Sequence, residues 1–585
     1  MKKVLFLFLL TIFSLNAFAQ STQPGFDLSQ YGVRIEPDKR LMTVLAALEA
    51  AGIETLLTTE GTKFRQELQT DLQNLSPELR QKLKNFVDQY KRRHPEAKPS
   101  EIITPFITMA YTLSPAPDLA DPTRTTDLPG DLLEVLDFAP LVREFYRALM
   151  KTKIDGYVKD YQKVGDSLRP YTAEMVSELL DYLHTRPQLT FIERVKTQTP
   201  SAKNKKKTLE KIEQRERTRQ FLIVPELLTA KGTINFLNIG DDYFTIVPPE
   251  TDVSSSEARR AFLQFVLDPL ILKNAKDIST FREGIKTLLD ERRKENKNVT
   301  PDIYLTTLRS LVAAVDARQI EFKKTRVATA QARLKIERQK TVEEKKAVSA
   351  ELEAFKKSVS DETAAQLSEA YENGAVLSFY FAEQLKGLED SGFDIAGSLR
   401  DIILSLDTTK EANRLPQFAE ARKRALLASE ERRKNVKNTG GEIVIESPVT
   451  RRLLEIEKVI ETKSYTKAET ELKRLLEENP SESRIYYALG RLAGLSAESI
   501  TDTQARNRRL MEAKVHYTNV IRTATSKTDP ALLSHNYVAL GRIYEFLDDS
   551  AYALKLYEAA IKVGEVTGGA HKEAAAAQQR LMKEQ

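Results

Sequence analysis

Apolar residues recur at three- and four-residue intervals over much of the chain, a spacing that predicts amphipathic helices. In the segment 37–53 the apolar face consists of Leu41, Val44, Leu45 and Leu48. The segment 76–93 repeats the pattern, and similar periodicity continues in residues 131–150 and 172–185. We therefore expect a mainly α fold, with residues 28–414 forming a mostly helical domain.

Three short stretches in the middle of the chain predict strands instead. Residues 221–228, 232–240 and 242–249 are rich in apolar and β-branched residues, with turn signals at Gly232 and Gly240. The segment 198–218 is polar and basic and has no comparable strand pattern. Any sheet is therefore expected to be small.

A long charged segment, residues 302–373, contains neither Gly nor Pro. Every seventh position carries Val327, Leu334, Thr341, Val348 and Phe355, but the second heptad position is apolar only at Leu352 and Val359. A two-stranded coiled coil needs both apolar positions in each heptad. The pattern favours a long solvated helix or a helical hairpin that packs one edge on the domain. The alternative is a coiled coil that makes a homodimer through residues 302–373.

The last part of the chain carries an internal repeat. In the segment 538–562, small and aromatic residues stand at defined offsets: Leu540, Gly541, Tyr544, Ala553, Tyr557 and Ala560. The same offsets occur upstream at Tyr486, Leu489, Gly490, Ala493, Ala513, Tyr517 and Val520, and more weakly at Ala468, Leu472, Leu475 and Pro480. This pattern resembles the tetratricopeptide repeat, in which small residues let paired helices cross closely.

The resemblance implies an α–α repeat domain over residues 448–585 with a polar capping helix at its end, preceded by a charged, glycine-containing linker, residues 415–447. Gly490 and Ala513 are 23 residues apart, against 12 between Gly541 and Ala553. An 11-residue insertion must therefore lengthen the turn or the helices of the middle unit.

Tetratricopeptide modules bind a peptide or protein surface in a concave groove formed by the first helix of each repeat. By family position, the groove residues here would be Arg484, Tyr487, Arg491, His535, Val538 and Arg542. Arginines on adjacent repeats can hold a carboxylate through paired hydrogen bonds. The alternative is that these arginines are solvated or pair with nearby glutamates such as Glu545.

The N-terminus has the features of a secretory signal peptide over residues 1–19. Lys2 and Lys3 precede an apolar run, and Ala17 and Ala19 form a small-x-small cleavage site. We expect a periplasmic or secreted protein, of bacterial type, that has no lipid anchor and no transmembrane segment after cleavage. An uncleaved membrane anchor is the alternative.

Composition narrows the possible chemistry. The absence of cysteine excludes disulfides, thiol catalysis and thiolate metal sites. A formal charge of +5 from 89 basic and 84 acidic residues is too balanced for a nucleic-acid-binding protein. No phosphate-binding loop, dinucleotide fingerprint or serine nucleophile motif is present. We expect no cofactor.

The segment 257–270 has the pattern of a buried helix that follows a strand and ends at Asp268-Pro269. With its surroundings it resembles secreted zincin-type (gluzincin-like) peptidase domains, in which an H-E-x-x-H helix stands at this place. On that resemblance, Arg260, Ala261 and Gln264 occupy the positions of the first histidine, the general base and the second histidine, and Arg309 that of the acidic third ligand.

None of these residue types suits a catalytic zinc ion. The sequence therefore predicts no metal and no catalytic residue in this domain. Together with the repeats, it favours a non-enzymatic exported adaptor or scaffold that binds a protein or peptide partner. The alternative is a secreted metallopeptidase-like hydrolase with an altered or lost active site.

Overall fold

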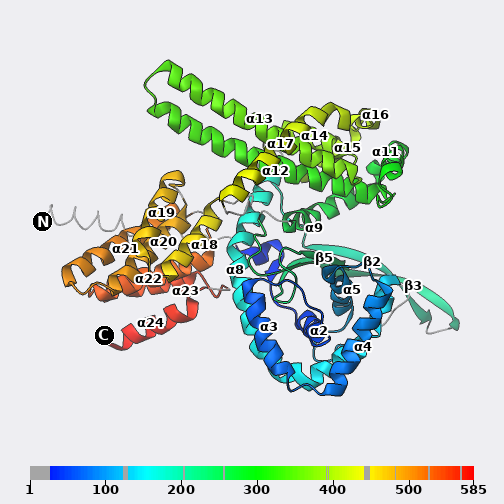
Figure 1. Ribbon diagram of the computed structural model, residues 1–585, viewed down its shortest axis with the longest axis horizontal. Helices are drawn as coiled ribbons and strands as arrows, with labels where there is room; N and C mark the ends of the chain where they lie inside the picture. Colours follow the sequence, from blue (N-terminus) through cyan, green and yellow to red (C-terminus); the bar gives the residue numbers. More distant parts are fainter. Residues whose placement is uncertain are drawn as a thin grey trace. The chain divides into compact units, whose positions relative to one another are not determined.

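A computed structural model describes residues 27–584 of the chain (Figure 1), except residues 123–129, 202–203, 255–256, 390–391, 393, 440–447, 481, 525–527 and 567–568. The predicted signal peptide lies outside the described residues. The chain divides into two compact units, whose main segments are residues 31–445 and 446–585. No helix in the described part of the chain combines the length and the apolar character needed to cross a bilayer.

The larger unit is mainly helical, as predicted. Its helices are α2 (Lys39–Ala50), α3 (Thr59–Leu72), α4 (Pro77–Arg93), α5 (Pro99–Thr112), α6 (Gly130–Leu136), α7 (Ala139–Phe145), α8 (Lys151–Leu183), α9 (Ala258–Lys273), α10 (Ala275–Thr280), α11 (Arg282–Glu295), α12 (Ile303–Arg338), α13 (Val342–Glu372), α14 (Ser378–Leu388), α15 (Ile395–Leu404), α16 (Thr408–Glu411) and α17 (Arg414–Thr439). A π-helical turn, η2 (Tyr146–Met150), joins α7 to α8.

The predicted small sheet has the order β1-β4-β6-β5, with β1 (Val33–Ile35), β4 (Gln220–Pro225) and β6 (Asp242–Val247) parallel and β5 (Asn235–Ile239) antiparallel at one edge. Phe221 and Tyr243 are register partners and pack on Phe265 of α9. Phe244, whose side chain points to the opposite face, packs on Tyr111 of α5. Helices thus cover both faces of the sheet.

A second pair of strands was not predicted. β2 (Thr190–Ser201) and β3 (Asn204–Thr218) form an antiparallel hairpin that extends from the sheet in Figure 1. Its sequence is polar, so the apolar alternation that marks a half-buried strand is missing. The backbone hydrogen bonds of an antiparallel ladder do not depend on that alternation, and the hairpin forms without it.

Residues 302–373 form a helical hairpin, one of the two arrangements favoured by their sequence. Helix α12 ends at Arg338 and α13 begins after Thr341. The Thr341 side chain accepts a hydrogen bond from the backbone of Glu344 (3.2 Å), and the Glu344 carboxylate accepts one from the Thr341 backbone (3.0 Å). This capping box starts a new helix, and α13 returns along α12.

Most of the predicted linker is in fact helical. Residues 414–439 form α17, which packs on α13. Arg422 pairs with Glu372 at 2.6 Å, and the ring of Phe418 stacks on Phe379 with centroids 4.4 Å apart. The charges that made this segment resemble a linker in part form ion pairs with the neighbouring helix.

Helix α9 continues through Pro269 to Lys273, so the prediction that it ends at Asp268-Pro269 was wrong. Proline lacks the N–H that would donate to the carbonyl of Phe265. The buried guanidinium of Arg219 donates to that carbonyl instead, at 3.0 Å. Arg219 also lies over the rings of Phe265 and Tyr243, 4.8 and 5.3 Å from their centroids. A distant side chain therefore supplies the missing hydrogen bond.

The smaller unit consists of α18 (Pro448–Glu461), α19 (Tyr465–Glu478), α20 (Ser483–Glu498), α21 (Thr503–Thr523), α22 (Pro530–Phe546), α23 (Ser550–Lys562) and α24 (His571–Glu584). Each helix packs on the next one along the chain, and α18, α20, α22 and α24 also contact one another in that order. The insertion mostly lengthens α21. Ten residues of α21 precede Ala513, whereas three residues of α23 precede Ala553.

Two glycines in this unit occupy equivalent places at helix crossings. A Cβ atom on Gly490 would lie 2.8 Å from the ring of Tyr517, and a Cβ on Gly541 would lie 2.8 Å from the ring of Tyr557. Real Cβ atoms do not approach other atoms so closely. The pairs α20–α21 and α22–α23 therefore cross at a distance that only glycine permits.

Replacing Gly541 by Ala is expected to destabilise the smaller unit by about 1–3 kcal/mol, because the added methyl group must displace the Tyr557 ring. Faster hydrogen exchange in α22 and α23, measured by mass spectrometry on the full chain, would report this loss. In a Tyr557→Ala background the same change is expected to cost nothing more.

Gly494 provides the matched control. It also lies within α20, but a Cβ there meets no atom within 4 Å. Gly494→Ala is expected to stabilise the unit by about 0.5–1 kcal/mol, the usual gain from replacing a glycine inside a helix. Equal effects of the two substitutions would show that the crossing at Gly541 is not close.

Candidate functional site

Helices α18, α20, α22 and α24 of the smaller unit carry two cross-helix ion pairs. Arg491 on α20 pairs with Glu457 on α18, and Arg542 on α22 pairs with Glu573 on α24. Both arginines remain accessible, with 43% and 67% of their side chains exposed. The surface therefore presents compensated arginine–glutamate pairs, and its two predicted arginines are not free cations.

Tyr487 is half-buried and stands one turn before Arg491 on the same side of α20. Its pKa is raised, first by burial and then by the carboxylates of Glu457 and Glu573, while Arg491 lowers it. Glu457 lies on α18 and Glu573 on α24, so carboxylates from two helices act on this phenol. Tyr487 also packs against the ring of Tyr517, with centroids 5.8 Å apart.

The other predicted groove residues are placed differently. Arg484 pairs with Glu482 at the start of its own helix, at 2.9 Å. His535 is half-buried. Val538 is only 3% exposed and belongs to the apolar core of the unit, so its side chain does not face a groove. Of the predicted residues, Arg491 and Arg542 are accessible and make cross-helix ion pairs, and Tyr487 stands one turn before Arg491.

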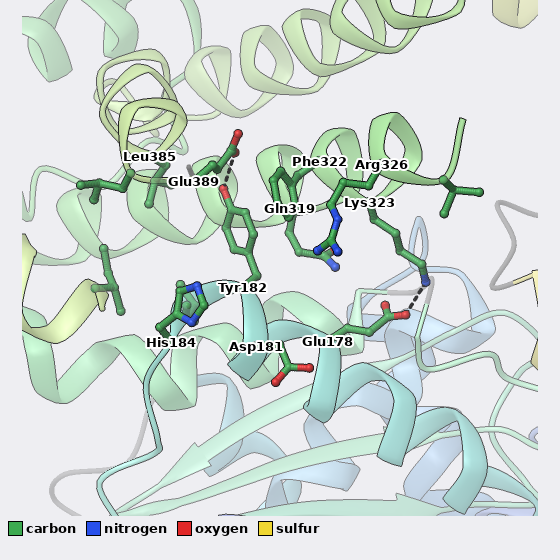
Figure 2. Close-up of a pocket in the computed structure, with 14 residues that line it drawn as sticks. Glu178, Asp181, Tyr182, His184, Gln319, Phe322, Lys323, Arg326, Leu385 and Glu389 are labelled. Atoms are coloured by element: carbon green, nitrogen blue, oxygen red, sulfur yellow. Dashed lines mark hydrogen bonds and ion pairs between the residues drawn. The ribbon is translucent and has the colours of Figure 1, made fainter. Parts of the chain in front are cut away.

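The larger unit contains a cavity of about 540 Å³ between α8, α12, α14 and the start of α15 (Figure 2). Gln319, Phe322, Lys323 and Arg326 line it from one face of α12, because residues at i, i+3, i+4 and i+7 fall on the same side of a helix. The last turn of α8 forms the opposite wall. The sequence did not reveal this site, since its walls come from segments far apart in the chain.

Ion pairs and hydrogen bonds hold two sides of this cavity together. Lys323 on α12 donates to Glu178 on α8 at 2.5 Å, and burial raises the pKa of that carboxyl. Tyr182 at the end of α8 donates to Glu389 at 2.8 Å. Arg318 makes two further hydrogen bonds to Glu389, of 3.0 and 2.6 Å. These contacts fix the walls of the cavity before any ligand enters.

The residues at the zincin-like positions form a different structure. Arg260 donates to Asp316 on α12 at 3.0 Å. Ala261 and Gln264 are half-buried, and Arg309 is exposed. Within the described part of the chain, no three or more His, Asp or Glu residues come together as a possible metal site.

A buried ion pair in this region was not predicted from the sequence. Arg259 is 4% exposed and donates to Asp316 at 3.0 Å and to the side-chain oxygen of Gln319 at 2.7 Å. Its place three residues before Phe262, and seven before Val266, puts it on the buried face of α9. That periodicity was a usable signal. What the sequence did not show was a buried carboxylate at Asp316.

A buried carboxyl group lies at the end of β4. Glu226 is fully buried, and one of its oxygens accepts hydrogen bonds from the hydroxyl of Tyr161 (2.7 Å) and the backbone N–H of Leu228 (3.1 Å). The other oxygen, Oε2, has no hydrogen-bond partner among the described residues. Burial raises the pKa of Glu226 to about 7.

Comparison with known proteins identifies no relative of this chain. No protein-family model matches the chain, and no curated protein or solved structure shows significant similarity to it. Function must therefore follow from the accessible surface around Tyr487 and from the cavity beside α12.

Proposed function

We propose that the chain is an exported, non-enzymatic adaptor whose C-terminal helices are tetratricopeptide repeats and bind a protein or peptide partner. The observation that carries this proposal is the matched pair of close crossings, Gly490 against Tyr517 and Gly541 against Tyr557. The contacts among α18, α20, α22 and α24 support it, because the first helices of stacked repeats line one surface.

Two further observations support the export and the absence of catalysis. The first 19 residues have the sequence features of a signal peptide. In the zincin-like region, two guanidinium groups bind Asp316, and the positions of the base and second ligand carry Ala261 and Gln264. The ion pairs of Arg259 and Arg260 with Asp316 hold α9 against α12.

We propose that the partner contributes a carboxylate to the surface around Tyr487. Arg491 and Arg542 are already paired with Glu457 and Glu573. An incoming carboxylate would therefore exchange with these glutamates. Removing the arginines is therefore expected to weaken partner binding, and removing the glutamates is expected to strengthen it.

The partner can first be captured with a photo-crosslinking phenylalanine at position 487 of the full chain, in extracts of the source cells. The Arg491→Ala/Arg542→Ala variant is then expected to bind the captured partner at least tenfold more weakly, since each charge-assisted hydrogen bond contributes about 1.5–3 kcal/mol. Glu457→Ala/Glu573→Ala is expected to bind it more tightly, because both arginines become free. Affinity is measured by titration with the purified partner.

The matched control is Arg508→Ala/Lys555→Ala, which also removes two cations but from exposed positions on the second helices α21 and α23. It is expected to leave the affinity unchanged. Unchanged binding in the Arg491→Ala/Arg542→Ala variant would refute this surface as the binding site. An equal loss of affinity in the control would mean that binding depends on the net charge of the unit and not on these two arginines.

A further inference from the structure

The cavity beside α12 contains hydrogen-bond donors that the fold leaves available. The guanidinium of Arg326 lies over the ring of Phe322, 5.4 Å from its centroid, and has no hydrogen bond or ion pair in the described part of the chain. Its five N–H groups are donors only. Arg326 is exposed at the mouth of the cavity, where a ligand can reach it.

Gln319 adds a second donor. Its side-chain oxygen accepts the hydrogen bond from Arg259, which has no acceptor to offer, so the assignment of oxygen and nitrogen is fixed. The amide nitrogen therefore points the other way, into the cavity and toward Arg326 (Figure 2). Gln319 is 4% exposed, so this donor is presented from a buried and rigid position.

The rest of the cavity wall is largely apolar. It is formed by Leu183, Phe322, Val327, Leu385, Leu388 and Ile395. A cavity of about 540 Å³ falls within the range of small-molecule sites, about 300–1,000 Å³. An apolar wall with donors at one end is complementary to a molecule with an apolar body and an acceptor head.

The carboxylates near the cavity do not oppose an anionic head. Glu178 is neutralised by Lys323, and Glu389 is held by Arg318 and Tyr182. The carboxylate of Asp181 points away from α12 in Figure 2. The group that stays uncompensated on the α12 side is the cation, Arg326.

We propose that this cavity is a binding site for an amphipathic organic anion, whose apolar body packs on α14 and Phe322 and whose charged head binds Arg326 and the Gln319 amide. Carboxylate and phosphate heads share the required chemistry. This site is independent of the adaptor surface, since it lies in the larger unit and uses none of the residues around Tyr487.

The test is isothermal titration of the full chain with dodecanoate, dodecyl phosphate and dodecyltrimethylammonium, each below its micellar concentration. One or both anions are expected to bind saturably with one site per chain, and the cation is not. Arg326→Gln is expected to weaken the binding at least tenfold. Gln319→Glu keeps the acceptor for Arg259 but replaces the donor with a negative charge, and is expected to weaken binding similarly.

Arg333→Gln is the control, because it makes the same charge change at an exposed position on α12 outside the cavity. It is expected to bind as the parent does. Circular dichroism and thermal melting check that each variant is folded. The proposal is overturned if neither anion binds saturably, if the cation binds as well as the anions, or if Arg326→Gln and Arg333→Gln bind alike.

Discussion

Asp316→Ala is expected to destabilise the larger unit by about 3–5 kcal/mol, the usual cost of leaving a buried charge without its partner. Asp316 is 7% exposed and receives hydrogen bonds of 3.0 Å from both Arg259 and Arg260. Removing it leaves the guanidinium of Arg259 buried at the α9–α12 contact with only neutral acceptors. A carbonyl oxygen of Ser254 and the Gln319 side chain do not neutralise its charge.

Urea denaturation followed by circular dichroism measures this loss, and hydrogen exchange in α9 and α12 locates it. Arg260→Ala serves as the matched control. Arg260 binds the same carboxylate but is 54% exposed, so its removal is expected to cost less than about 1 kcal/mol. An Asp316→Ala variant as stable as Arg260→Ala would contradict the buried ion pair.

Local periodicity was sufficient to predict the mainly helical fold and the strands β4, β5 and β6 of the small sheet, but not β1. The apolar faces of α2 and α4 and the strand patterns of β4, β5 and β6 lie within single short segments of the sequence. For residues 302–373 the sequence left open a single long helix or a helical hairpin, and the structure shows the hairpin. Elements whose stabilising contacts leave no apolar pattern in their own sequence were missed. The hairpin β2–β3 depends on backbone pairing between two polar segments, and α17 on ion pairs to α13, such as Arg422 with Glu372.

Helix α9 also depends on a contact that its own sequence does not indicate. Proline is a correct local signal for the end of a helix. Arg219, 46 residues earlier in the chain, donates to the carbonyl that Pro269 leaves without a partner, and the helix continues. No pattern within the segment 257–270 contains that information.

The candidate sites were also only partly predictable from the sequence. Repeat spacing placed Arg491 and Arg542 on the first helices, but their partners lie 34 residues upstream and 31 residues downstream. The sequence left open whether these arginines are free to bind a partner or pair with nearby glutamates such as Glu545. The structure pairs them with the more distant Glu457 and Glu573. The α12 cavity combines three distant segments, so only the fold brings Arg326, Gln319 and the apolar wall together.

Glu226→Gln is expected to stabilise the larger unit by about 3 kcal/mol at pH 8 and by almost nothing at pH 4. Burial holds the pKa of this carboxyl at about 7, against an ordinary value of 4.5. Below pH 4.5 the group is protonated in both the folded and the unfolded chain, so it imposes no penalty. Between pH 4.5 and 7 the unfolded chain loses the proton and the folded chain keeps it, so stability falls as pH rises.

The size of the effect follows from about 1.4 kcal/mol per pKa unit. Glutamine stays neutral at every pH, and its carbonyl oxygen accepts the same hydrogen bonds from Tyr161 and Leu228 that Oε1 accepts now. Urea midpoints at pH 4, 6 and 8 give the profile. Glu337→Gln removes an equal charge from an exposed position on α12 and is expected to show a flat difference across this range. A stability gain for Glu226→Gln that did not grow with pH would mean that the Glu226 carboxyl ionises as readily in the folded chain as in the unfolded one.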